Sequence, residues 1–285
     1  MNRNSKMRPT FRAIPFRSPS SYALALIALC TCMTLSRQEV RAQNSSQTTA
    51  STDIANSRSP SDTVREFYKA MREKRFREAF AMSIYKPAIE GLKPEEFEDL
   101  RPDFERIAAV MPDRVEINGE QLSADEATVF IKVKADEKPE QAEPVTLIRV
   151  DGNWIVGDKE NQEIVKKAGK TFFFKARIDT HHSEVQAMLQ RIAVAQLVYS
   201  QQHAGKFGNM ATLISAALIP KDVEGTESTG YRFRITVSPD GRSWSAAAEP
   251  AKYGRSGRLS FFMDKSGVRS GDVSGKPLPA SPLRN

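Results

Sequence analysis

The stretch VTLIRVDGNWIV, at residues 145–156, contains two strand-forming runs joined by a two-residue turn. Residues 145–150 are rich in β-branched side chains, and residues 154–156 continue the apolar pattern after the turn. The Asp151-Gly152 pair favours a hairpin, because glycine tolerates a positive φ at no steric cost. The stretch therefore predicts two adjacent antiparallel strands.

Working outward from this hairpin, apolar residues alternate at residues 115–117 and 128–134, which predicts two more strands. Further upstream the apolar period changes to that of a helix. Helices are predicted from an N-cap at Ser59, over Phe76–Phe80, over Glu95–Val110 with a break or kink at Pro102, and later over Gln162–Lys170. Helices followed by an antiparallel meander predict an α+β domain with its helices packed on one sheet face.

The C-terminal part of the sequence repeats this layout with different elements. A capping box at Ser183 and Gln186 predicts the start of a long helix that runs to about His203. A short helix over residues 210–217 and strands at 231–237, 244–248, 261–263 and 268 follow. Pro239-Asp240-Gly241 predicts the turn between the first two of these strands. The sequence thus predicts a second α+β domain, with a long helix lying across an antiparallel meander.

Three motifs of the first domain resemble the nuclear transport factor 2-like (SnoaL-like) superfamily. They are TVREFYKAM at Thr63–Met71, FREAF at Phe76–Phe80 and VDGNWIV at Val150–Val156. The resemblance implies a sheet that curls around a cone-shaped pocket. Some members of the superfamily are enzymes with an Asp–His or Tyr–Asp arrangement in the cone, and many bind ligands or pack against partners.

The second domain resembles the globular headpiece of type IV pilins and pseudopilins. The motifs are IAVAQLVY at residues 192–199, GYRF at 230–233 and FMDKSGV at 262–268. Pilins begin with a long apolar helix that packs the fibre, whereas TFFFKAR at residues 171–177 has few apolar residues before charges intervene. The resemblance therefore implies a headpiece that lacks the assembly helix.

The N-terminal segment has the pattern of a signal peptide. Five basic residues precede the 14-residue apolar run Tyr22–Leu35, which is short for a membrane span of ~20 residues. Small residues at Val40 and Ala42 predict cleavage after Ala42. An uncleaved leader would instead anchor the chain in a membrane, and a lipid anchor fits Cys30 and Cys32 poorly. Cleavage would leave a mature chain without cysteine, and hence without disulfides.

Polar residues at 43–58 predict a flexible linker, and Pro277, Pro279 and Pro282 with Gly275 predict that the tail is disordered or forms an extended arm. The predicted organisation is a signal peptide at 1–42, a disordered linker at 43–58, a first α+β domain at 59–170, a hinge at 171–182, a second α+β domain at 183–272 and a disordered tail at 273–285.

The charge of the chain argues against a nucleic-acid partner. The formal net charge is +7, but residues 1–42 hold seven basic residues and one acidic residue. Of the 42 basic and 35 acidic residues, the remainder holds 35 and 34, so it is nearly neutral. Binding to nucleic acid needs a concentrated basic surface.

Candidate site residues fall into two sets. Tyr68, Phe80, Phe104 and Trp154 could line an apolar ligand pocket in the cone or fill the core of the first domain. Arg232 and Arg234 share the outer face of a predicted strand, where they could bind an acidic partner or remain solvated.

Other titratable residues favour structural interpretations. The first domain has no histidine, which removes the commonest general base near neutral pH. The acidic run Glu95, Glu96, Glu98 and Asp99 is typical of a solvated helix face. His181-His182 suggests a hinge, because adjacent helical residues point about 100° apart and rarely chelate one ion.

The sequence predicts no catalytic residues, metal or cofactor. The first hypothesis is an exported, non-catalytic cell-envelope protein, periplasmic or extracellular, which acts as an interaction or adaptor module for another envelope protein. The alternative is binding of a small apolar ligand, or weak enzymatic activity, in the cone of the first domain.

Overall fold

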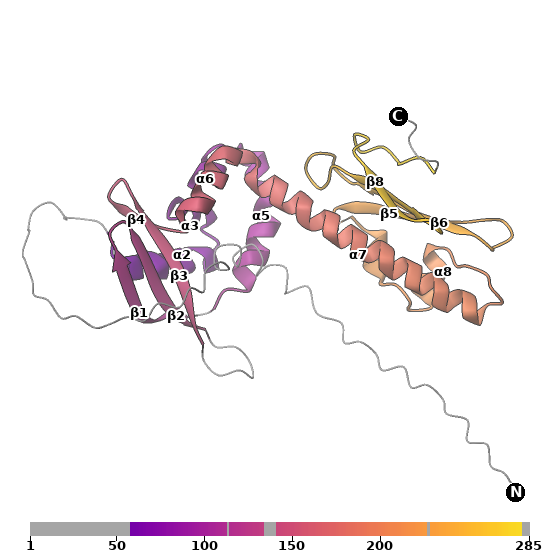
Figure 1. The fold of residues 1–285 in the computed structure, drawn as a ribbon, viewed down its shortest axis with the longest axis horizontal. Helices are drawn as coiled ribbons and strands as arrows, with labels where there is room; N and C mark the ends of the chain where they lie inside the picture. Colours follow the sequence, from indigo (N-terminus) through magenta and orange to yellow (C-terminus); the bar gives the residue numbers. More distant parts are fainter. Residues whose placement is uncertain (1–57, 113, 134–140, 227–228, 281–285) are drawn as a thin grey trace, which may run out of the picture. The chain divides into compact units, whose positions relative to one another are not determined.

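The computed structural model describes residues 58–112, 114–133, 141–226 and 229–280, so the predicted leader and nearly all of the linker lie outside the described residues. The described chain mixes helices with antiparallel strands and forms two separate four-stranded sheets (Figure 1). The predicted α+β class is therefore confirmed. The chain divides into two compact units. The first unit comprises the residues up to Ile84 and Phe104–Asn161, and the second comprises Tyr85–Asp103 and the residues from Gln162 onward.

The first unit contains two helices and one sheet. They are α2 (Pro60–Arg72), α3 (Phe76–Ala81), β1 (Glu116–Ser123), β2 (Glu126–Val133), β3 (Gln141–Val150) and β4 (Asn153–Val156). Helix α5 (Pro94–Ala109) passes from the second unit into the first after Asp103. It continues through Pro102, so the predicted break there is wrong. Because proline has no backbone N–H, the helix lacks one hydrogen bond at Pro102, and the remaining bonds of α5 hold it together.

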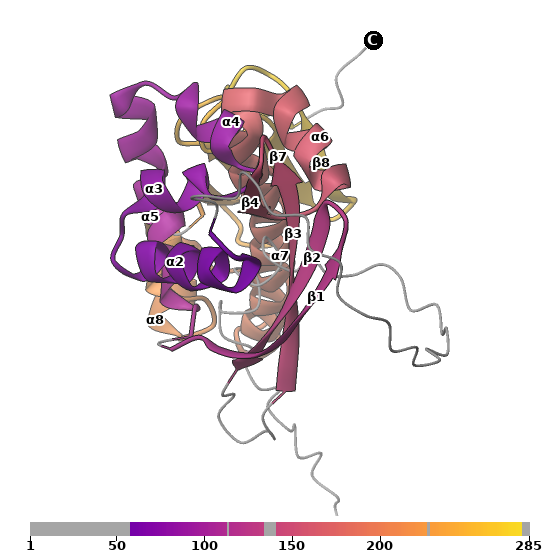
Figure 2. The same cartoon turned by 90° about the vertical axis from the view of Figure 1, so that its left-hand side faces the viewer.

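Helix α2 begins as the sequence predicts. The amide of Asp62 donates to the Ser59 hydroxyl over 3.1 Å, and Pro60 occupies the first turn, where its missing N–H costs nothing. The helix buries Val64, Phe67 and Met71 along one side. Figure 2 shows α2 crossing one face of the sheet.

The sheet of the first unit is an antiparallel meander in the order β1-β2-β3-β4. Val150 pairs with Asn153 across the predicted two-residue turn, in which Asp151 and Gly152 have φ of 48° and 78°. Both values lie in the left-handed region that this type of turn requires, so the predicted hairpin is confirmed. A bulge between Ile117 and Gly119 interrupts the register of β1, and bulges increase local twist and bending.

The second unit contains a long helix, several short helices and the other sheet. They are α4 (Lys86–Glu90), η1 (Gly169–Thr171), α7 (Phe172–Gln202), α8 (Met210–Ser215), η2 (Lys221–Glu224), β5 (Tyr231–Val237), β6 (Trp244–Pro250), β7 (Ser260–Asp264) and β8 (Gly267–Gly271). Helix α6 (Lys159–Ala168) begins at the end of the first unit and continues into the second.

Helix α7 begins at Phe172, 11 residues before Ser183, where the capping box predicts its start. Residues 171–182, predicted as a hinge, are helical almost throughout. The physical reason is a continuous buried stripe. Phe174, Ile178 and His181 are buried at helical spacing, and the stripe continues through Val185 and later positions. Charged residues between these positions occupy the other faces of the same helix.

The second sheet is also an antiparallel meander, in the order β5-β6-β7-β8. Figure 1 shows α7 lying along this sheet, with α8 beside it. The core contains Leu189, Ile192 and Leu213 from the helices, together with Tyr231 and Phe261 from the strands. All five residues are fully buried, so the helix-on-meander layout is fixed by packing rather than by any disulfide.

Part of the predicted disordered tail is packed. Leu278 is only 6% exposed and contacts Ala247 and Phe262 on the second sheet. The side chain of Arg269 donates to the carbonyls of Pro279 and Ala280. The prediction of disorder is therefore wrong for residues 273–280, and residues 281–285 lie outside the described residues. In the described part of the chain, none of the helices combines the length and apolar character that a membrane crossing needs.

Candidate functional site

The aromatic residues predicted for the cone lie in the first unit, mostly inside its core. Phe80 and Phe104 are 3% and 0% exposed, and their ring centroids lie 4.9 Å apart in an edge-to-face contact. Phe76 contacts the same Phe104 ring at 5.6 Å. These contacts fill space, so for Phe80 and Phe104 the structure favours the core interpretation over a pocket lining.

Tyr68 and Trp154 differ from that pair. Tyr68 is 8% exposed, and its hydroxyl has no hydrogen-bond partner among the described residues. Burial, with a smaller contribution from the charge of Glu143, raises the pKa of Tyr68 to about 12. Trp154 is half-buried on β4, and the Arg149 guanidinium lies 5.9 Å from its ring.

Arg232 and Arg234 both project from β5 and are exposed, as the alternation of the strand predicts. Arg234 donates to Glu249 on the neighbouring strand over 2.7 Å. Arg232 stands opposite Glu249 in the register and forms no ion pair with any described residue. The sheet therefore supplies a carboxylate for Arg234, whereas Arg232 stays exposed and unpaired among the described residues, so binding of an acidic partner by this face stays a prediction.

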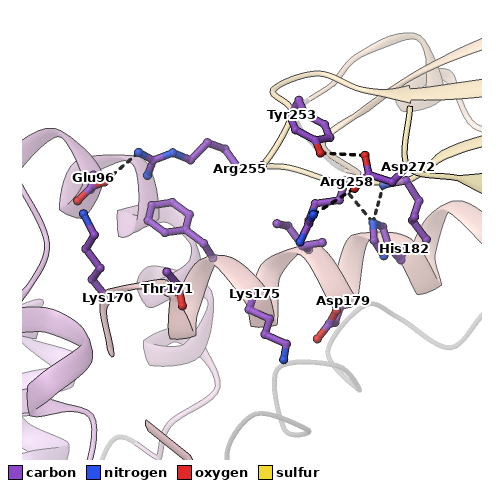
Figure 3. Close-up of a pocket in the computed structure, with 14 residues that line it drawn as sticks. Glu96, Lys170, Thr171, Lys175, Asp179, His182, Tyr253, Arg255, Arg258 and Asp272 are labelled. Carbon is purple, nitrogen blue, oxygen red and sulfur yellow. Dashed lines mark hydrogen bonds and ion pairs between the residues drawn. The ribbon is translucent and has the colours of Figure 1, made fainter. Parts of the chain in front are cut away.

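A cavity of about 790 Å³ lies within the second unit, away from both predicted sets of residues. One wall is η1 and the first three turns of α7. The opposite wall is the loop between β6 and β7, and Glu96 and Asp272 complete the lining (Figure 3). Its volume falls in the range of ligand-binding clefts. The lining combines apolar surface from Phe174, Ile178 and Leu259 with charged side chains at the rim.

Two histidines fix the loop to α7. The Nδ1 of His181 lies 2.7 Å from the carbonyl oxygen of Ser256, so this nitrogen must donate. The Nε2 of His182 lies 3.3 Å from the amides of both Arg258 and Leu259, so it must accept. Adjacent helical positions thus bind two parts of one loop.

The acceptor role of His182 decides its protonation state. A nitrogen that accepts two amide protons has no lone pair left for another proton, so the ring is neutral. Burial lowers the pKa of His182; the charge of Asp179 opposes this shift, and the charge of Arg258 adds a smaller lowering. His182 lines the cavity, but it cannot abstract a proton there while the loop is bound.

The acidic run of α5 is solvated only in part: Glu95 and Glu98 are exposed, as the sequence predicts, whereas Glu96 is buried and Asp99 is half-buried. Glu96 is 9% exposed and binds Arg255 over 2.9 Å, and the Arg255 guanidinium lies 4.2 Å from the Phe174 ring. Arg177, only 10% exposed at its side chain, binds both Asp99 and Asp103. These side chains hold the first half of α5 to α7 and to the loop within the second unit.

Hydrogen bonds also hold the carboxylates of the cavity in their charged form. A hydrogen bond from the Lys93 amide, then the bond from Arg255 and the charge of Lys170, lower the pKa of Glu96. The Tyr253 hydroxyl donates to Asp272 over 2.8 Å and lowers the pKa of that carboxyl, with Arg258 adding a second contact. Neither carboxyl is suited to proton transfer near pH 7.

Over the residues that the structure describes, no group of three or more His, Cys, Asp or Glu side chains could hold a metal ion.

Comparison with known proteins gives little support for an identity. No family model matches the chain, and no curated protein matches it. One solved structure that resembles part of the chain is that of a Campylobacter jejuni protein named an NTF2-like transpeptidase. The two are 18% identical, with a TM-score of 0.25, and the match covers 35% of this chain and 98% of that one. A likeness at this TM-score supports no argument. What is established is the class: an α+β protein with two separate four-stranded antiparallel sheets.

The sequence did not reveal the cavity, because its residues are far apart along the chain. Arg255 and Glu96 are 159 positions apart, and Arg258 and His182 are 76 positions apart. The available signal was the aromatic and basic composition of residues 171–177 followed by two histidines. Charged residues interrupt that segment and favour a hinge, whereas Phe174 and Ile178 lie on one buried stripe of α7.

Proposed function

We propose that the chain is an exported, non-catalytic binding module of the cell envelope, which recognises another protein through the cavity of the second unit. The observation that carries this proposal is an open cavity of about 790 Å³ with one wall fixed to α7 by His181 and His182. Export rests on the leader sequence at residues 1–42.

A binding role fits the chemistry of the lining better than catalysis. The basic nitrogen of His182 accepts two backbone amides, and the lowered pKa values of Glu96 and Asp272 keep both carboxyls ionised near neutral pH. A general acid or base works best with a pKa near the working pH. These groups are arranged to hold the walls of the cavity.

The side chains at the rim favour a protein as the bound partner. Tyr253 is 43% exposed, and Arg255 lies over the nearly buried Phe174 ring. Tyrosine, arginine and other aromatic side chains carry much of the binding energy at protein interfaces, because they present large surfaces with few rotatable bonds.

The proposal is tested by photo-cross-linking in the producing cell. A benzoylphenylalanine replaces Tyr253, where the exposure of the ring leaves room for the larger side chain, and the matched control carries it at Val194, which is 61% exposed on α7 and outside the cavity. We expect a discrete cross-linked polypeptide from position 253 and not from position 194. The same products from both positions, or none from position 253, would overturn the proposal.

A second candidate function is the binding of a small apolar ligand in the cone of the first unit. The specific observation in its favour is Tyr68, a polar member of the aromatic set that is only 8% exposed as a residue, although its hydroxyl is not among the fully buried atoms that lack a partner. Native mass spectrometry of the exported chain distinguishes the two candidates. A small added mass lost in a Tyr68→Phe variant supports the cone, whereas an added polypeptide supports the cavity of the second unit.

Two family relationships are part of the proposal. The order of helices and meander in the first unit supports a nuclear transport factor 2-like cone. The long helix across four strands supports a pilin-like headpiece in the second unit, which would serve recognition rather than assembly.

A further inference from the structure

Of the three carboxylates that line the second-unit cavity, those of Glu96 and Asp272 are occupied as hydrogen-bond acceptors, whereas that of Asp179 accepts no hydrogen bond from a described residue. One oxygen of Glu96 accepts from Arg255 and the other from the amide of Lys93. The oxygens of Asp272 accept from the Tyr253 hydroxyl and the Arg258 guanidinium, and one of them also accepts a backbone amide. Little acceptor capacity is therefore left on Glu96 or on Asp272, which lie on opposite sides of the cavity in Figure 3.

Donors, in contrast, remain available. A guanidinium carries five N–H groups, and Arg255 uses one of them on Glu96. Its flat face lies over Phe174, which leaves the N–H edge free to meet a planar acceptor, and its side chain is 38% exposed. The ammonium of Lys170 makes no hydrogen bond or ion pair with a described residue, although it is near enough to lower the pKa of Glu96.

The free donors point to one place. In Figure 3 the side chains of Lys170 and Arg255 converge on Glu96, whereas Lys175 and Asp179 project from α7 away from Arg255. Lys170 and Arg255 are two cations beside the single carboxylate of Glu96, so these three side chains keep a net charge of about +1. Phe174 and Ile178, each 7% exposed, line the same cavity and offer an apolar surface next to these donors.

We propose that this end of the cavity binds an acidic peptide segment of the partner protein. A carboxylate of the peptide bonds to the free N–H edge of Arg255 and to the ammonium of Lys170, and an adjacent apolar side chain rests on Phe174 and Ile178. A single carboxylate matches the excess charge, whereas a phosphate brings a charge of −1.5 to −2 towards Glu96. This inference rests on the proposed function and names the chemistry of its partner.

The test is a selection from a random library of twelve-residue peptides on the exported whole chain, followed by affinity measurements by fluorescence anisotropy. We expect the selected peptides to be enriched in Asp or Glu beside apolar residues. Replacing those acids by their amides should weaken binding about tenfold, which corresponds to ~1.4 kcal/mol. An enriched set without acids, or peptides whose amide forms bind equally well, would contradict the inference.

Variants locate the site. Lys170→Gln, which leaves the Arg255–Glu96 pair in place, should weaken the best acidic peptide about fivefold, as expected for one partly exposed charge-assisted bond. Arg255→Lys keeps the positive charge but removes the planar edge, and it should weaken binding at least as much. Lys265→Gln, at the β7–β8 turn and outside the cavity, is the matched control and should bind like the parent. Equal binding by all four chains would overturn the inference.

Two other results separate this inference from the proposal on which it rests. Cross-linking to a polypeptide at position 253 together with a non-acidic peptide set would leave the binding module intact and remove its acidic specificity. Stronger binding to phosphatidylglycerol vesicles than to peptides, lost in Lys170→Gln, would replace the peptide by a lipid headgroup. Absence of a cross-linked polypeptide would remove the proposed function itself.

Discussion

The ion pairs of Arg177 should contribute strongly to the stability of the second unit. Its Nε donates to Asp103 over 2.7 Å, and its guanidinium also reaches Asp99, 74 and 78 positions earlier in the chain. The side chain is 10% exposed, against 18% for Asp103 and 28% for Asp99. Replacing Arg177 by methionine keeps most of the aliphatic volume but removes the buried guanidinium from two partly buried carboxylates.

Removing one partner of a buried ion pair typically costs 3–5 kcal/mol, because the remaining charge is left without solvent or partner. The aspartates here keep some exposure, and Lys252 lies 3.6 Å from Asp99, so the loss should fall near the lower limit. We expect Arg177→Met to lower the free energy of unfolding by about 3 kcal/mol. Adding Asp99→Asn and Asp103→Asn should restore more than about 1 kcal/mol, since the uncompensated charges are gone.

The chain offers a clean assay, because each unit has one of its two tryptophans. Trp154 lies in the first unit and Trp244 in the second, so a Trp154→Phe background makes fluorescence report on the second unit alone. With a urea dependence of about 2 kcal/mol/M, a loss of 3 kcal/mol shifts the midpoint by about 1.5 M.

The matched control is Lys166→Met, which removes an exposed pair with Glu163 at i, i+3 spacing and should cost less than about 0.5 kcal/mol. If Arg177→Met shifted the midpoint no more than this control, the contacts of Arg177 would be ordinary solvated pairs. The acidic run of α5 would then be the open helix face that its composition suggests.

Two further predictions concern buried hydrogen bonds on α7. Stability of the second unit should decline as the pH falls below about 6.5, because the pKa of His182 is lower in the folded than in the unfolded state and unfolding therefore takes up a proton in that range. In His182→Gln the urea midpoint should change less between pH 7.5 and pH 5. The control His203→Gln, at an exposed position, should keep the decline. Gln196 is fully buried and both donates to and accepts from the backbone of Gly208, so Gln196→Ala should cost about 2–4 kcal/mol in the same assay, while Gln190→Ala on the exposed side of the helix should stay within about 0.5 kcal/mol. A pH decline unchanged in His182→Gln, or equal midpoints for the two glutamine variants, would contradict these assignments.

Local patterns in the sequence were sufficient to predict most of the secondary structure. The Asp151-Gly152 hairpin and the Ser59 cap depend on residues a few positions apart, whose conformational preferences act without help from the rest of the chain. Alternation over Tyr231–Val237 predicted β5 for the same reason, since its odd positions face a core and its even positions face solvent.

Predictions failed where distant contacts decide the outcome. Ser183 has the sequence of a helix cap, yet its hydroxyl donates to the carbonyl of Asp179 inside a longer helix. Tertiary burial of Phe174 and Ile178 extends α7 on the N-terminal side of this local start signal, as packing commonly overrides local preference. The packing of Leu278 could not be predicted for the same reason, because its contacts with Ala247 and Phe262 depend on residues far from the proline-rich segment.

The acidic run of α5 shows why composition alone could not locate the site. A row of carboxylates on a helix is solvated unless cations elsewhere in the fold meet it, and here Arg177 and Arg255 do so from α7 and from the β6–β7 loop. Arg255 then has two roles: one N–H holds Glu96 to the fold, and the remaining edge faces the cavity. A change at Arg255 will therefore alter stability and binding together, whereas Lys170→Gln alters the cavity while leaving the Glu96 pair intact. Suppose that Lys170→Gln loses peptide affinity while its urea midpoint stays unchanged. The two neighbouring cations would then have different roles, with Lys170 serving binding alone and Arg255 serving both binding and folding. The excess of hydrogen-bond donors in the cavity would then serve recognition rather than stability.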